Sequence, residues 1–110
     1  MSLIRAEDMI VGTPLPGWTG RFFHAENVTC AIWEIEPGAT PLHEHHHPNE
    51  EVWNVVEGEI ALSLCGVEHI LKAGDALVVP KDAPHAARPL GHCRAVVVDW
   101  PVRRHLPGVG

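Results

Sequence analysis

The stretch HEHHHPNEE, residues 43–51, is the segment from which both the fold and a candidate site can be inferred. It places four imidazoles and three carboxylates within nine residues, and a further histidine, His85, follows later in the chain. Core packing and solubility explain such a cluster poorly, because both kinds of side chain are polar and both bind cations. Imidazole and carboxylate together are the ligands of borderline divalent transition metals: Fe(II), Mn(II), Ni(II), Cu(II) or Zn(II). The working hypothesis is therefore one such ion as a cofactor.

The bulk composition is that of a folded globular domain. The chain has 110 residues, of which 45% are hydrophobic and 20% charged, enough for one domain with its own core. Its formal net charge of -6 argues against nucleic acid as a partner. The N-terminus lacks an uninterrupted apolar stretch, so we expect no signal peptide, no membrane partner and a cytoplasmic location. The three cysteines form no C-x-x-C pair and are expected to be free thiols.

Short apolar runs between glycine and proline turns predict an all-β fold, a sandwich or a barrel. Residues 1–29 are less regular and are expected to form an N-terminal arm, and residues 101–110 an extended C-terminal strap. The single domain spans residues 1–110, with the barrel core at 30–100. The predicted strands cover residues 30–36, 52–56, 59–64, 68–71, 76–79, 85–88 and 94–100.

Strand geometry suggests which side chains of the stretch act together. Residues two apart in a strand point to the same face, so His45 and His47 should project together, and His43 with them if the strand extends back. Residues 48–50 then form a turn, and Glu51 opens the returning strand as a cross-strand neighbour of His47. Two histidines and a carboxylate leave coordination positions open, and His85 can supply a fourth ligand.

Two motifs resemble those of small single-domain cupins. In the first, residues 38–58, Gly38 is followed by six residues, His45-x-His47, three residues, Glu51, six residues and Gly58. In the second, residues 74–89, Gly74 is followed by five residues, Pro80-x-Asp82, two residues and His85. Asp82 stands where cupins usually have glycine, and Pro89 where they have asparagine. Both departures fall outside the usual ligand positions.

The resemblance implies an antiparallel jelly-roll β-barrel, cupin-like, with His45, His47, Glu51 and His85 as metal ligands. An alternative register uses His43, His45, Glu51 and His85, because only four residues separate Gly38 from His43. His43 would otherwise lie at the mouth of a substrate pocket. Trp53 shares a strand face with Glu51 and could line that pocket.

The function expected is that of a metal-dependent enzyme of dioxygenase type, an oxidoreductase acting on a small oxygenated molecule. Catalysis would be centred on the metal, and no catalytic side chain beyond its ligands can be named. The alternatives are a non-catalytic module that binds a small molecule or metal, and a metal-dependent isomerase or lyase. The resemblance also suggests a homodimer in which the arm or the strap crosses to the partner.

Overall fold

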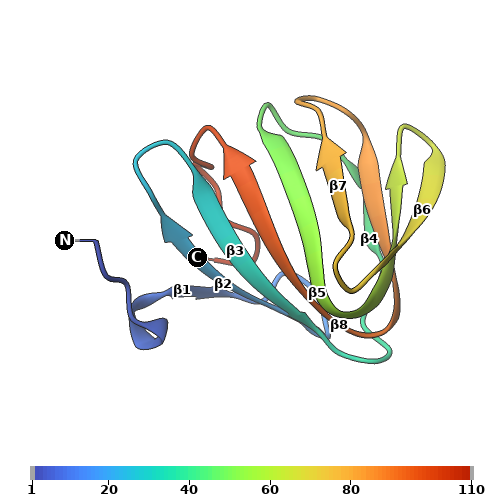
Figure 1. The fold of residues 1–110 in the computed structure, drawn as a ribbon, viewed down its shortest axis with the longest axis horizontal. Helices are drawn as coiled ribbons and strands as arrows, with labels where there is room; N and C mark the ends of the chain where they lie inside the picture. The colour runs from blue at the N-terminus through green and yellow to red at the C-terminus, as the bar shows by residue number, and fades with distance from the viewer. Residues whose placement is uncertain (1, 110) are drawn as a thin grey trace.

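The computed structural model describes residues 2–109 and consists of eight antiparallel strands in one hydrogen-bonded sheet (Figure 1). A single turn of 3-10 helix, Ala6–Asp8, precedes the first strand. No helix within residues 2–109 is long and apolar enough to span a membrane. The strands are β1 (Ile10–Gly12), β2 (Trp18–His24), β3 (Thr29–Ile35), β4 (Leu42–His45), β5 (Glu50–Leu64), β6 (Val67–Lys72), β7 (Ala76–Val79) and β8 (His85–Trp100).

The long strands β5 and β8 each belong to both faces of the barrel. The later half of β8 pairs with β3 and with the first half of β5, and β2, β1 and β7 extend this first face. The early half of β8 pairs with β4 and with the second half of β5, and β6 completes the second face. Figure 1 shows both strands bending over at the bottom of the view. The antiparallel jelly-roll barrel predicted from the sequence is confirmed.

Gly58 makes the bend of β5 possible. Its φ is +74°, and the register between β5 and β8 shifts on either side of it. A Cβ at this position would lie 1.9 Å from the carbonyl oxygen of His92 on β8. Only glycine can take this conformation this close to a neighbouring backbone.

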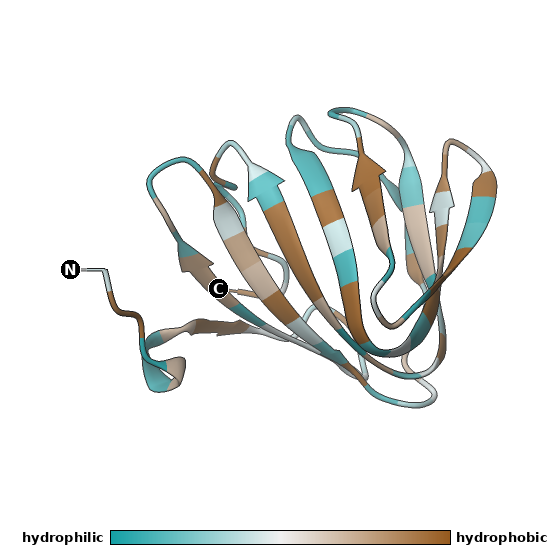
Figure 2. Cartoon of the chain, in the orientation of Figure 1, coloured by the Kyte–Doolittle hydropathy of each residue, from teal (hydrophilic) through white to brown (hydrophobic). Residues whose placement is uncertain are grey.

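Alternating burial along the strands builds the core. Strand β3 alternates fully, with Ala31, Trp33 and Ile35 facing inward, and Figure 2 shows bands of opposite hydropathy along β5. Burial of one residue in two is what a sheet with one face on a core requires. The side chains with the least exposure, 0 to 1%, include Ile35, Val55, Ile60, Cys93 and Ala95.

The strand boundaries correct the sequence analysis at three places. The predicted strands 52–56 and 59–64 are one strand, β5, and 85–88 and 94–100 are one strand, β8. Their glycines produce a bulge or bend instead of a chain reversal. The region 1–29 is not an irregular arm, because it contains β1 and β2 and buries Trp18 and Phe22. The stretch 42–45, predicted only as a possible extension, forms β4.

Candidate metal centre

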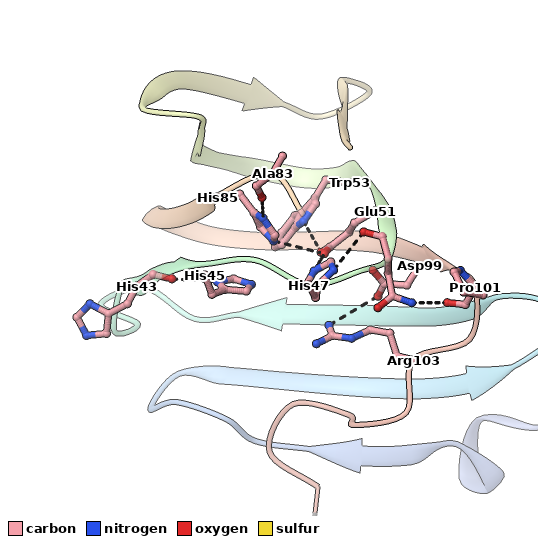
Figure 3. A network of polar contacts seen from close by, with 11 residues as sticks. His43, His45, His47, Glu51, Trp53, Ala83, His85, Asp99, Pro101 and Arg103 are labelled. Atoms are coloured by element: carbon pink, nitrogen blue, oxygen red, sulfur yellow. Dashed lines mark hydrogen bonds and ion pairs between the residues drawn. The ribbon is translucent and has the colours of Figure 1, made fainter. Parts of the chain in front are cut away.

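Three histidines converge inside the barrel from two segments far apart in the chain. His45 ends β4 and lies directly opposite His85, the first residue of β8. His47 follows β4 by two residues, on the way into the turn before β5. Each contributes a ring nitrogen, and these three atoms lie within 4.8 Å of one another (Figure 3).

Hydrogen bonds to the backbone orient all three imidazole rings. Each ring uses Nδ1 to contact a main-chain carbonyl oxygen, and an acceptor of this kind requires a proton on Nδ1. In the neutral ring, Nε2 then carries the lone pair that a metal needs. The Nδ1···O distances are 3.0 Å from His45 to His43, 3.2 Å from His47 to Asn49 and 2.8 Å from His85 to Ala83.

Glu51 faces these nitrogens from the opposite side of the barrel. Its Oε2 lies 2.5 Å from Nε2 of His47 and 3.5 Å from Nε2 of His85. The indole Nε1–H of Trp53 donates to Oε1 at 2.8 Å and so fixes the carboxylate plane. Burial alone would disfavour its negative charge, but contacts with His47 and His85 outweigh burial and hold the pKa of Glu51 well below its usual range.

The histidine pKa values differ because the rings have different neighbours. Burial, with smaller repulsion from the other rings, lowers the pKa of His45. Burial acts in the same direction on His85, but Glu51 and the Ala83 carbonyl outweigh it, so the pKa of His85 is raised. His45 therefore stays neutral more readily than His85, as a metal ligand must be.

The donor set fits a divalent transition metal on three grounds. Nε2 of His85 is buried and has no hydrogen-bond partner. Nδ1 of His47 donates to the Asn49 carbonyl, so Nε2 of the neutral ring carries a lone pair. This nitrogen and the Glu51 oxygen are then two acceptors 2.5 Å apart, and such a contact needs a proton or a cation between them. Three imidazoles and one carboxylate also match the ligand preference of such metals.

Asp99 is a second buried carboxylate beside Glu51, and sequence reasoning missed it. The two residues are direct register partners on β8 and β5, and Asp99 Oδ1 is buried without a hydrogen-bond partner. Burial, followed by repulsion from Glu51, raises the pKa of Asp99 to about 7. Like charges directly opposite each other on neighbouring strands are unfavourable unless a cation lies close. The signal was present in the alternation of Ala95, Val97 and Asp99 on one strand face.

A cavity of about 310 Å³ opens beside this cluster. His45, Glu51 and Asp99 form its polar side, and the walls are mostly aromatic and aliphatic. Arg103 and His105 reach it from the C-terminal strap. Its remaining lining residues are Pro14, Trp18, Phe22, Ala31, Trp33, Leu42, Trp53, Val97, Leu106 and Pro107.

The predicted site residues fall into two groups. His45, His47, Glu51 and His85 come together, although β4 pairs with β8, so Glu51 reaches His47 across the turn and not as a cross-strand neighbour. His43 is exposed, and Figure 3 shows its ring pointing away from the other three, so the geometry does not favour the alternative register. His43 does not line the cavity, whereas Trp53 does.

Comparison with known proteins agrees with this arrangement. The cupin domain family matches residues 31–100, which include both histidine motifs. The chain belongs to the cupin family. Family membership and the histidine-rich cluster are both consistent with metal binding by this barrel.

Two solved structures are similar to nearly the whole chain, and a third protein is similar in sequence to part of it. A cupin described as RmlC-like from Shewanella frigidimarina has a TM-score of 0.84 at 23% identity, covering 94% of each chain. KdgF from Halomonas sp. has a TM-score of 0.83 at 21% identity, covering 94% of this chain and 96% of its own. Protein SchB from Streptomyces halstedii is 37% identical over 65 residues, 58% of this chain and 46% of that protein. The match thus spans about half the length of SchB.

Domains of longer enzymes have the same fold. Oxalate decarboxylase of Bacillus subtilis, described with Mn(II) centres, has a TM-score of 0.77 at 19% identity over 89% of this chain and 29% of its own. Salicylate 1,2-dioxygenase from Pseudoaminobacter salicylatoxidans has a TM-score of 0.75 at 20% identity over 81% of this chain and 26% of its own. At these identities the likeness concerns the fold alone.

Proposed function

We propose that this cupin is a mononuclear metal-dependent enzyme, an oxidoreductase of dioxygenase type acting on a small oxygenated molecule. The ligands in this proposal are His45, His47, Glu51 and His85. The observation that carries it is the convergence of three backbone-anchored imidazoles and a buried carboxylate beside a cavity. The dioxygenase and decarboxylase folds described above support it as relatives in fold.

The side chains around the site have separable tasks in this proposal. A bound divalent ion supplies Lewis acidity and, if redox-active, electron transfer. The carbonyls that hold each Nδ1 keep the rings in a coordinating tautomer, and Trp53 holds the Glu51 carboxylate in its orientation. The apolar walls exclude bulk water from the reacting end of the substrate.

Elemental analysis of untagged protein tests the metal site first. We expect about one equivalent of metal, lost in His45→Ala and in His85→Ala. His43→Ala and His46→Ala are matched controls from the same stretch, because both side chains are exposed, and these variants should keep the metal. Substoichiometric metal that neither His45→Ala nor His85→Ala changes would refute the site and favour a metal-free binding module.

Oxygen uptake tests the reaction type. Protein reconstituted anaerobically with Fe(II) is mixed with a panel of small oxygenated compounds, and oxygen consumption is measured against product formation. Stoichiometric uptake supports the dioxygenase proposal. Turnover without oxygen would replace it with an isomerase or lyase, for which Asp99 would offer a carboxyl group for proton transfer at the edge of the cavity. If a panel compound binds saturably and none is turned over, the result would favour a non-catalytic binding module.

A further inference from the structure

We propose that the substrate is a small monocarboxylate with an apolar body of aromatic size, and that Arg103 on the C-terminal strap binds its carboxylate. This inference rests on the proposed function, because it assumes that the reacting end of the molecule faces the metal cluster. It is carried by the position of the strap, by the unused donors of Arg103 and by the shape and chemistry of the cavity.

The strap is fixed over the cavity at several points. The backbone N–H of Arg103 donates to Thr29 Oγ1 at 2.9 Å, and Asn49 Nδ2 donates to the carbonyl of Pro101 at 2.5 Å. Further along, the N–H of Thr13 donates to the Gly108 carbonyl at 3.4 Å. Because the strap is hydrogen-bonded to the barrel both before and after Arg103, the backbone holds this side chain at the cavity.

Arg103 retains hydrogen-bonding capacity for a ligand. Its Nη1 lies 3.7 Å from Asp99 Oδ2, which is an ion-pair distance but too long for a hydrogen bond. Figure 3 shows the guanidinium below Asp99 and His47. A guanidinium presents five N–H donors in a planar fork that matches a carboxylate. An anionic group entering the cavity can therefore pair with Arg103 without displacing Asp99.

The charges around the cavity favour a negative charge on the ligand. A bound divalent ion and Arg103 carry more positive charge than Glu51 offsets, and this holds whether Asp99 is ionised or protonated. An anionic ligand reduces this excess in a mostly apolar enclosure, where an unbalanced charge is costly. A neutral ligand would leave it uncompensated.

The walls describe the rest of the ligand. Trp18, Trp33 and Trp53 line the cavity together with Phe22, and the Trp33 ring packs edge-on against both Trp18 and Phe22. This surface is aromatic, and it suits a planar or compact apolar body. A cavity of about 310 Å³ holds a molecule of roughly benzoate size with some space left.

Benzoate and benzamide are a suitable probe pair, because they share a ring and differ in charge. Binding is followed by intrinsic tryptophan fluorescence of zinc-loaded protein, since three of the four tryptophans line the cavity. We expect wild-type protein to bind benzoate at least about tenfold more tightly than benzamide, the scale of one charge-assisted contact. Arg103→Gln should remove this preference and leave benzamide binding unchanged.

Arg104→Gln is the matched control, because Arg104 is the exposed neighbour and does not line the cavity. It should bind both probes as the wild type does. Equal benzoate affinity in Arg103→Gln and wild type would overturn the proposal, since the carboxylate would then bind zinc alone. Equal affinity of wild type for both probes would overturn it as well, and this comparison needs no variant to fold.

Zinc content measured on the same samples separates this proposal from the metal site. If the protein holds no zinc, the proposed function fails, and the benzoate and benzamide comparison on metal-free protein still decides the role of Arg103. If zinc is present and the Arg103 preference is absent, the substrate class fails while the metal site stands.

Discussion

The two ends of the barrel use the same two strands for opposite purposes. At one end β5 and β8 bend over, and Val55, Ile60 and Cys93 pack there with no more than 1% exposure. At the other end the same strands begin and finish, with Glu51 on β5 and His85 on β8 facing each other across the interior. The bend end buries apolar groups, whereas the site end buries charged and polar ones.

This difference follows from how closely the backbones approach each other at the two ends. At the bend the backbones approach closely, as the position of Gly58 against His92 requires, and side chains fill the remaining space. At the site end the chain diverges into turns whose carbonyls are available to hold imidazole rings. Stability should therefore depend mainly on the bend end and metal binding mainly on the site end.

The largest expected effect is that of Gly58→Ala at the bend. The substitution places a Cβ 1.9 Å from the His92 carbonyl oxygen at a φ of +74°, so the strands must separate. We expect a loss of roughly 3 kcal/mol in the free energy of unfolding, measured by urea denaturation. Gly38→Ala is the control, because its φ of +78° is similar but nothing lies within 4 Å of the added Cβ. The free energy of unfolding should therefore fall by only about 1 kcal/mol, from backbone strain. Equal losses in both variants would show that the bend is not tightly packed.

At the site end, Trp53→Phe should weaken metal binding with little loss of stability. The change removes the N–H that donates to Glu51 at 2.8 Å and leaves the carboxylate free to rotate. Loss of a hydrogen bond to a ligand of this kind typically lowers metal affinity about 10- to 100-fold. Competition with a zinc chelator measures the effect, and Trp33→Phe is the control in the same cavity wall. Similar affinities in the two variants would show that Trp53 acts only as part of the wall.

The sequence predicted the site end of the barrel more accurately than the bend end. The histidine spacing and Glu51 brought together the residues that the structure also brings together, because ligand chemistry restricts residue type and spacing. The glycines at the bend were interpreted as chain reversals, since a bulge inside a long strand and a turn between two short ones use the same residue. Strands β1 and β2 were missed because their burial depends on contacts with β3 that no local pattern reveals.

Asp99 and Arg103 were missed for a different reason. A single acidic residue at the end of an apolar run is usually a solvated strand end, so the alternation with Ala95 and Val97 was not a sufficient signal, and the register opposite Glu51 explains its burial. Arg103 depends on the path of the strap, which the sequence predicted only as extended. The homodimer stays a prediction; exposed apolar side chains such as Val56, Val78 and Trp100 on the outer surface are consistent with it.

A smaller effect is expected from the charges on the outer surface of the bend end. Partial burial is the largest single influence on the pKa of Glu34 and raises it, but the combined contacts with Arg94 and His92 outweigh burial and lower the pKa overall. A carboxyl whose pKa is lowered on folding stabilises the protein above its unfolded pKa, and this contribution disappears as the pH falls through the folded value. Glu34→Gln should therefore cost less than about 1 kcal/mol at pH 7, and the cost should shrink as the pH is lowered, by urea denaturation over a series of pH values. A cost independent of pH would assign the effect to packing.

The smallest perturbation changes no residue and compares two thiols. Cys65 is exposed in the turn after β5, where its N–H donates to the Pro84 carbonyl one residue before His85, so it belongs to the site end. Cys93 is fully buried at the bend, where burial and then the charge of Glu34 raise its pKa to about 11. Native protein treated with iodoacetamide at pH 8 should be modified at Cys65 within minutes, while Cys93 should react only at the rate of unfolding, by peptide mass spectrometry. Rapid modification of Cys93 would mean that the bend end opens as readily as the site end, and that the two ends do not differ in stability.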